Sequence, residues 1–118
     1  MPEITVKLNI AHDPPVTCDP HQCPLPSGEQ TIAWSKGGSD KAFKIIRVVI
    51  DDSNINGPFT NNQPNGEKWN VHDKNNDSAE YFYELTVETL DKKTYSTKEK
   101  RRKIGGGGGG GGPSIKNN

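Results

Sequence analysis

Two cysteines and a histidine lie close together in the segment Cys18-Asp-Pro-His21-Gln-Cys23. Thiolate and imidazole groups are ligands that zinc and copper accept, and nearby proline turns could hold them together. His12 lies in the same stretch and extends the candidate ligand set. One hypothesis from these residues is therefore a metal-binding or thiol redox protein with zinc or copper as its cofactor.

The same spacing has two other interpretations. A structural zinc site usually needs a second Cys/His pair, and no cysteine follows Cys23. In an oxidising compartment the two cysteines could form a disulfide, and otherwise they are ordinary loop thiols. A cupredoxin also needs a weak methionine ligand, and the only methionine is Met1, which excludes that class.

A second candidate is the basic run Lys98-Glu-Lys-Arg-Arg-Lys103. Clustered cations can contact phosphates, so residues 98–103 raise the hypothesis of a nucleic-acid-associated protein. No aromatic residue is interleaved and no groove-reading motif is present, which disfavours nucleic acid as the partner. The chain has 15 basic and 15 acidic residues, with the excess of basic residues after position 90. A basic tail that rests on its own acidic body is the simpler explanation.

Motifs for catalysis are absent from the sequence. The glycine run 105–112 lacks the Lys-Ser/Thr pair that ends a phosphate-binding loop. No Ser/His/Asp or Cys/His order matches a known nucleophile context. Asp51-Asp52 and the Asp73/Asp77 pair lack the calcium-loop pattern, so turn capping is favoured. We therefore expect no enzymatic activity and no cofactor as the leading interpretation.

The elements that must position these residues are short β-strands. Residues 3–10 and 81–90 alternate apolar and polar side chains, so each strand has one buried and one wet face. The apolar parity changes near Ile45-Ile46, which indicates either a β-bulge or a strand that is covered on both faces. The strand at 81–90 is predicted to be the central one. Further strands are predicted over residues 29–35, 42–50, 69–71 and 93–97, and Asp91-Lys92 is predicted to be a tight turn that leads into the last of them and makes a hairpin. About seven short strands separated by turns predict an all-β, immunoglobulin-like antiparallel β-sandwich.

The start of the strand at residues 81–90 adds to this prediction. Asp77-x-Ala79-x-Tyr81 looks like the approach to a tyrosine corner, in which a tyrosine hydroxyl bonds to the backbone a few residues upstream. Two positions later comes Tyr83, where antibody domains carry a cysteine. The alternative is an ordinary strand that begins with Asp and Tyr.

Two long stretches between the strands are predicted to be loops. Residues 11–28 contain five prolines, which exclude a helix and a central strand, and residues 51–68 are polar and rich in turn dipeptides. Gly37-Gly38-Ser39-Asp40 is predicted to be a turn. Binding residues tend to lie on loops held by a rigid scaffold. The leading prediction is therefore a non-catalytic binding or structural module that uses loops 11–28 and 51–68 to contact an unknown protein or small-molecule partner.

We expect one domain over residues 1–104, a flexible glycine linker at 105–112 and a tail at 113–118. In the tail, Ile115 could dock as a last edge strand. No secretory signal and no bilayer-spanning run is visible. We therefore expect a cytoplasmic protein without a membrane partner, either a monomer or a homodimer paired through edge strands.

Four short patterns carry a resemblance to a known family: Ile-x-Trp34, Phe43-Lys-Ile, Tyr83-x-Leu-x-Val and a closing Pro113-Ser-Ile-x-Asn. In this order they resemble small bacterial β-sandwich proteins of unknown function, the family named for its DP and EP dipeptides. Chains of that family tend to end with Asp-Pro-x-Ile-x-Asn. Here Gly112 replaces the Asp, and there is no Glu-Pro dipeptide. The resemblance implies an immunoglobulin-like fold and a bacterial origin, and it transfers no activity and no site residues.

Overall fold

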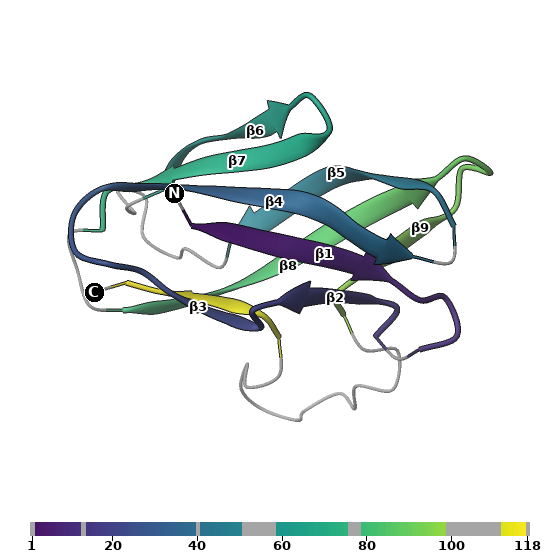
Figure 1. Ribbon diagram of the computed structural model, residues 1–118, viewed down its shortest axis with the longest axis horizontal. Coiled ribbons are helices and arrows are strands. Elements are labelled where there is room, and N and C mark those ends of the chain that lie inside the picture. Colours follow the sequence, from purple (N-terminus) through teal and green to yellow (C-terminus); the bar gives the residue numbers. More distant parts are fainter. Residues whose placement is uncertain are drawn as a thin grey trace.

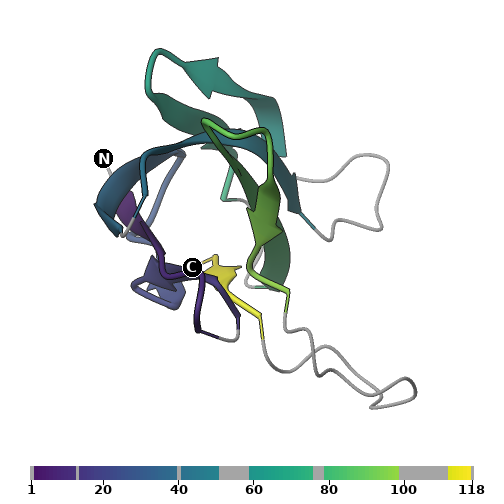
Figure 2. The same cartoon turned by 90° about the vertical axis from the view of Figure 1, so that its right-hand side faces the viewer.

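The computed structural model describes residues 2–12, 14–39, 41–50, 59–75, 79–98 and 112–117. These residues form ten β-strands and no helix, packed as two sheets (Figure 1). Figure 2 shows the sandwich from its end, with the sheets facing each other across the core. The prediction of an all-β sandwich is confirmed, with ten strands in place of seven. Over the same residues, no helix is long and apolar enough to cross a membrane.

The first sheet has the strand order β2-β1-β4-β7-β6. Its strands are β1 (Glu3–Leu8), β2 (Val16–Asp19), β4 (Gln30–Ser39), β6 (Phe59–Asn65) and β7 (Lys68–Asp73). β1 and β4 run parallel with Ile4 opposite Trp34, and the other neighbours in this sheet run antiparallel.

The second sheet has the strand order β3-β10-β8-β5, and β9 also pairs with β8. Its strands are β3 (Gln22–Pro24), β5 (Phe43–Ile50), β8 (Glu80–Thr89), β9 (Thr94–Ser96) and β10 (Ser114–Lys116). β3 and β10 run parallel. Both sheets are therefore mixed, and the prediction of a purely antiparallel sandwich is wrong. The parallel pairs join strands that are remote in the chain, which an alternation pattern does not report.

β8 is the central strand of the second sheet, as its alternating sequence predicts. It pairs with β5 along one edge, and with β10 and β9 at the two ends of the other edge. Tyr83, Leu85 and Val87 point into the core. The β-bulge predicted near Ile45-Ile46 is confirmed, because the register with β8 shifts between Ile45 and Arg47. The bulge keeps both Ile45 and Val48 buried.

The prediction that residues 11–28 form a loop is wrong in two places, because β2 and β3 lie within them. The five prolines flank these strands or stand at their ends, so each strand keeps the backbone donors it needs. Between β2 and β3 the chain crosses from the first sheet to the second, through a cis peptide bond at Asp19-Pro20.

The predicted loop at 51–68 is also partly a strand. Residues 59–65 form β6, which pairs with β7 across a turn that contains Gly66 with a positive φ of 64°. Residues 51–58 of that prediction lie outside the described residues. The side chain of Asn62 donates a hydrogen bond of 2.8 Å to the Val48 carbonyl and so links β6 to the free side of β5.

The prediction of a turn at Gly37-Gly38-Ser39-Asp40 is wrong for residues 37–39, which are the last part of β4, and Asp40 lies outside the described residues. A Cβ atom on Gly37 would lie 2.4 Å from Thr5 Cγ2 on β1. Such a distance is far below van der Waals contact, so the close approach of β1 to β4 requires glycine at this position. The glycine is therefore a packing residue rather than a turn signal.

The core lies between the sheets and is centred on Trp34, which is completely buried. Its ring meets that of Tyr83 edge to face, with 5.3 Å between the centroids. This contact joins β4 of the first sheet to β8 of the second. The buried apolar residues around it are Ile4, Val6, Leu8, Val16, Cys18, Cys23, Leu25, Ile32, Phe43, Ile45, Val48, Val71, Leu85, Val87 and Ile115.

The segment 113–117 is a structural part of this core. β10 lies between β3 and β8 rather than at a sheet edge, and Ile115 is fully buried (Figure 1, yellow). Its neighbours across the strand pairs are Cys23 on β3 and Tyr81 on β8. β3 therefore has its only sheet partner, among the described residues, in β10.

Candidate functional site

The four residues of the predicted metal site lie in different environments. Cys18 and Cys23 are free, buried thiols in the core, whereas His12 and His21 are exposed. The His12 ring contacts the Pro14 carbonyl through Nδ1 at 2.9 Å. Within the described ranges, no three His, Cys, Asp or Glu side chains are grouped to hold a metal ion.

The surroundings of the two thiols favour their neutral form. Burial raises the pKa of Cys18 to about 11, and contact with the Tyr83 hydroxyl opposes this only in part. Burial also raises the pKa of Cys23. Because the thiolate is the nucleophile and the metal ligand, a buried neutral thiol is suited to packing rather than to chemistry.

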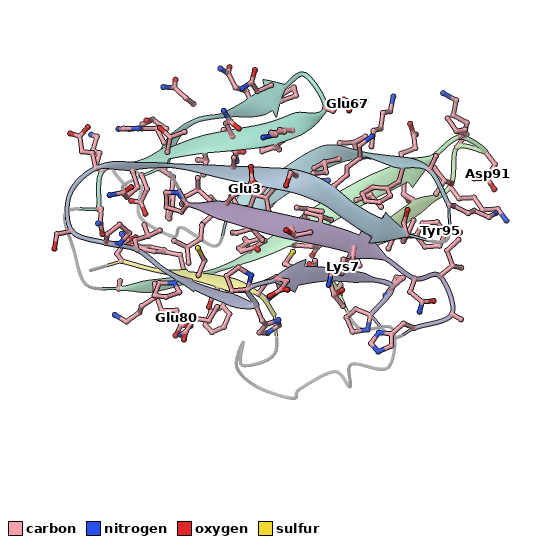
Figure 3. The ribbon with its side chains drawn as sticks, in the orientation of Figure 1. Glu3, Lys7, Glu67, Glu80, Asp91 and Tyr95 are labelled. Atoms are coloured by element: carbon pink, nitrogen blue, oxygen red, sulfur yellow. The ribbon has the colours of Figure 1, made fainter. Side chains whose placement is uncertain are left out.

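A different group of residues gathers at one end of the sandwich, where β1, β4 and β8 finish and β5 begins (Figure 3, around the labelled Lys7 and Asp91). We call this the turn-bearing end. It consists of residues 9–12 and 14–15 between β1 and β2, residues 41–42 before β5, and residues 90–93 between β8 and β9. Three separate connections therefore meet on one surface.

The first of these connections is organised by Asn9. Its backbone N–H donates to the Pro15 carbonyl at 2.8 Å, and its own carbonyl accepts from His12 N–H at 3.0 Å. Its side-chain oxygen accepts a third bond, from Ala11 N–H at 3.2 Å. An asparagine that bonds its own backbone in this way favours a fixed turn, so the His12 side chain is presented from a rigid loop.

The connection between β8 and β9 is a tight turn, as the Asp91-Lys92 pair predicts. Lys92 has a φ of 69° and donates its N–H to the Thr89 carbonyl at 3.0 Å. The Thr89 hydroxyl donates to the Asp91 carboxylate, and this bond, followed by the nearby Lys41 ammonium, lowers the pKa of Asp91. The turn leaves Leu90 at its tip with 86% of its surface exposed.

Depressions lie on both sides of this end. One of about 570 Å³ lies against β1 and β2 and is lined by Lys7, Leu8, Asn9, His12, Pro15, Thr17, Gly38 and Ser39. Another, of about 270 Å³, is lined by Lys36, Ala42, Phe43, Lys44, Glu88, Thr89, Leu90 and Lys92. A third, of about 210 Å³, is lined by Lys41, Ala42, Thr89, Leu90 and Asp91. Five lysines and two acidic residues therefore border the described depressions.

Four of these lysines have an acidic neighbour, but at a distance too long for a hydrogen bond. The N–O distances are 3.6 Å for Lys44–Glu88, 3.8 Å for Lys41–Asp91, 3.8 Å for Lys36–Glu67 and 3.9 Å for Lys7–Asp19. All four pairs include a largely exposed side chain, and exposed pairs stabilise by about 0–1 kcal/mol each. The ammonium groups can therefore take new anionic partners at little cost in stability.

Sequence reasoning missed this surface because its cations are scattered along the chain. Lys7, Lys36 and Lys92 come from distant segments, and only the folded topology brings them to one end. The predicted loop at 11–28 contributes His12 and Pro15, while the described part of the predicted loop at 51–68 lines none of the three depressions. The local signal that was available is an apolar residue at a tight turn beside two lysines.

His72 lies away from both candidate sites. Its Nε2 contacts the Glu29 carboxylate at 3.2 Å and its Nδ1 lies 3.5 Å from the Thr31 hydroxyl. Of the predicted basic run at 98–103, only Lys98 is among the described residues.

The chain matches no protein-family model and no curated protein sequence.

Proposed function

We propose that the protein is a non-catalytic binding module that holds an acidic segment of a partner protein at its turn-bearing end. The observation that carries the proposal is the gathering of five lysines around three depressions, with the exposed Leu90 among them. Carboxylates of a partner would replace the weakly held Asp and Glu neighbours of the lysines. Leu90 would supply a single apolar contact at the tip.

The charge distribution supports an acidic partner. Residues 1–90 carry 13 acidic and seven basic side chains, so the lysines of this end stand out from an acidic body. A local positive surface attracts acidic partners and repels basic ones, and this gives specificity more than raw affinity. Binding should therefore weaken as salt screens the charges.

The experiment is a titration of the isotope-labelled protein with the acetylated peptide Glu-Glu-Leu-Glu-Glu-Glu, followed by backbone amide NMR shifts. The expected result is saturable shifts at residues 36–44 and 88–93, lost at high salt. The triple variant K41E/K44E/K92E should bind at least tenfold more weakly. The matched control is K68E, which changes an equally exposed lysine on β7.

Two results would reject the proposal: shifts spread evenly over the surface, or equal binding by the triple variant and by K68E. A peptide with lysine in place of glutamate serves as the charge control and should cause no saturable shift.

We further propose that the sandwich is immunoglobulin-like. In such folds one sheet holds strands B, E and D and the other holds C, F and G. The order β4-β7-β6 fits the first set, and the order β5-β8-β10 fits the second. Trp34 and Tyr83 then stand on the B-like and F-like strands, where antibody domains place their inter-sheet disulfide. The resemblance to the DP-EP family and the bacterial origin that it implies are consistent with this fold, and we include both in the proposal.

The metal or redox alternative receives less support from the surroundings of its residues. Zinc or copper binding would need the neutral, buried Cys18 and Cys23 to lose their protons and meet histidines that lie at the surface. Two reduced thiols are consistent with a cytoplasmic location, which we propose on this ground. Elemental analysis tests for bound metal, and a free-thiol count tests whether the two cysteines are reduced. Bound metal would make this alternative the leading one.

The nucleic-acid alternative rests on residues 98–103, most of which lie outside the described residues. Salt-sensitive retention on DNA that is lost on deletion of 98–103 would support it. For oligomeric state, a monomer or an edge-paired homodimer remains our prediction. The Asn62 bond to the Val48 carbonyl disfavours pairing through β5 at that point.

A further inference from the structure

The segment 113–117 contains β10, which pairs with strands that are remote from it in the sequence. Four backbone hydrogen bonds join the segment to residues that are remote in the sequence. Ser114 N–H donates to the His21 carbonyl at 2.9 Å, and Leu25 N–H donates to the Lys116 carbonyl at 3.0 Å. On the other side, Tyr83 N–H donates to the Pro113 carbonyl at 3.0 Å. These bonds tie the segment to residues in and next to both neighbouring strands, β3 and β8.

The seat of this strand is a slot between β3 and β8. These two strands are joined only through β10 in the described sheet order β3-β10-β8. We call the seat the β3–β8 slot, formed by residues 21–25 and 79–83. Without β10 the slot would have two unpaired strand edges and a gap where Ile115 fills the core.

The slot recognises side chains as well as backbone. Ile115 is the apolar anchor, fully buried among the core residues. Ser114 Oγ donates to Glu80 Oε2 at 2.6 Å, and Gln22 Nε2 donates to the same oxygen at 2.6 Å. Asn117 is buried, and its side-chain amide lies 3.4 Å from Asp73 Oδ1. These contacts fit the sequence Ser-Ile-x-Asn, and Asp73 of β7 adds to the residues of the slot.

The sequence joins this strand to the rest of the fold through the glycine run 105–112. Residues 113–117 therefore contact the slot in the way that a peptide ligand joined to the protein by a linker would. An extended segment that adds to an exposed strand edge is a known recognition mode. The same segment of another copy carries identical contacts.

We propose that the β3–β8 slot is a peptide-binding site that accepts the 113–117 strand of a second copy of this chain, giving a reciprocally exchanged dimer. Reciprocal exchange fills both slots and closes the assembly, as in domain-swapped dimers. A short flexible linker gives an effective concentration of about 1 mM. The glycine run 105–112 has the composition of such a linker, so a chain's own strand should fill its slot in dilute solution. Exchange becomes measurable when the chain is unfolded and refolded at a concentration near that value.

A pair of positions reports which copy fills the slot. Lys116 faces Glu80 in the antiparallel pair of β10 and β8. The bonds at Tyr83–Pro113 and at Asn117–Ala79 make the Lys116–Glu80 pair a non-hydrogen-bonded one, in which the Cα atoms approach to about 4.5 Å. Cysteines at these two positions can therefore form a disulfide.

The experiment uses the full chain in two single variants, E80C and K116C, which differ in isotope content. They are mixed in equal amounts, unfolded, refolded at 1 mM and oxidised gently, and the products are read by mass spectrometry under non-reducing conditions. The expected result is a mixed dimer, linked between the two new cysteines, in at least tenfold excess over the E80C–K44C mixture. Lys44 is an exposed residue on β5 and so measures random encounters.

The double variant E80C/K116C, oxidised at about 10 µM, should close the bond within one chain and remain a monomer. If that bond forms but the mixture gives no excess of mixed dimer, exchange between copies is refuted. Failure of the double variant to close would refute the slot itself.

Direction is tested by adding I115D to one partner at a time. In the K116C chain, I115D should abolish the mixed dimer, because the donated strand loses its apolar anchor. In the E80C chain, it should leave the yield equal or higher, because that slot has lost its own competitor. Equal loss in both cases would contradict the proposal. The mixture of E80C and K116C remains decisive if I115D chains fail to fold.

Discussion

Replacing Tyr83 by phenylalanine should stabilise the fold, although it removes a hydroxyl group that lies beside the Cys18 thiol and the Trp34 indole N–H. The Tyr83 hydroxyl is buried, and among the described residues it has no partner with good hydrogen-bond geometry. The Trp34 indole N–H beside it is also buried without such a partner. Burial is the main cause that raises the pKa of the Tyr83 hydroxyl, which reflects how poorly its surroundings replace water.

The magnitude follows from the cost of an unpaired buried hydroxyl, which is about 1–3 kcal/mol. The poorly aligned contacts with Cys18 and Trp34 offset a part of this, so Y83F should gain about 0.5–2 kcal/mol. The phenyl ring keeps its edge-to-face contact with Trp34, because that contact does not involve the oxygen. At about 4 °C per kcal/mol for a domain of this size, the melting temperature should rise by about 2–8 °C.

The assay is urea unfolding followed by the fluorescence of Trp34 and Trp69. The midpoint should move to higher urea while the slope stays constant, since a single oxygen does not alter the surface exposed on unfolding. The matched control is Y95F on β9, where Tyr95 is only half-buried. That substitution should change stability by less than about 0.5 kcal/mol.

A loss of stability in Y83F larger than about 0.5 kcal/mol would refute this reasoning. Such a loss would mean that the hydroxyl makes a good hydrogen bond in the core, and the Cys18 thiol would then be the partner to test by C18A in the Y83F background.

Three further predictions concern other parts of the fold. I115A should lose about 2–5 kcal/mol in urea unfolding, because it empties a fully buried site, and a loss below about 1 kcal/mol would mean that β10 is not part of the cooperative core. Folded Cys18 holds its proton more tightly than the unfolded thiol, so its stabilisation is complete below pH 9 and is lost between pH 9 and about 11, by about 1.4 kcal/mol per unit. C18A should flatten this alkaline loss, and an unchanged pH profile would contradict the assignment. G37A should lose about 1–3 kcal/mol from its clash with Thr5, T5S should recover a part of it, and G38A should not reproduce the effect through a clash, since no atom lies within 4 Å of its added Cβ.

The sequence predicts those parts of the fold that depend on local alternation. The strand around Tyr83, the bulge near Ile45 and the turn at Asp91-Lys92 each have a periodic or turn signal of their own. All three are found in the structure. Side-chain alternation and turn residues act over a few positions, so a single sequence is enough to find them.

The remaining features depend on contacts between distant segments. The parallel pairing of β1 with β4 and of β3 with β10 leaves no local trace. The prolines of residues 11–28 predict a loop, although β2 and β3 form within this segment. These two short strands are stabilised by pairing with strands elsewhere in the chain. Gly37 carries the signal of a turn, yet it is fixed by Thr5 across a strand pair.

The candidate site escapes prediction for a similar reason. Lysines are common surface residues, and the sequence gives no sign that Lys7, Lys36 and Lys92 meet at one end of the sandwich. The conspicuous Cys18 and Cys23, by contrast, are placed by burial into the core. Residue type alone suggested metal binding or redox chemistry at these cysteines. Burial raises the pKa of each thiol and so disfavours the thiolate that such chemistry uses.

The late position of β10 in the chain also has a consequence for translation. β3 ends at Pro24, whereas β10, its only sheet partner among the described residues, begins at Ser114. β3 therefore has no sheet partner until Ser114 and the residues after it have been synthesised. At about 5–20 residues per second, the ribosome needs roughly 5–20 s to add the intervening residues. During this interval the nascent chain keeps the core beside Cys23 and Leu25 open to water. We therefore expect the fold to close only after β10 has been synthesised, and a chaperone that covers apolar strands to act on the chain before that point.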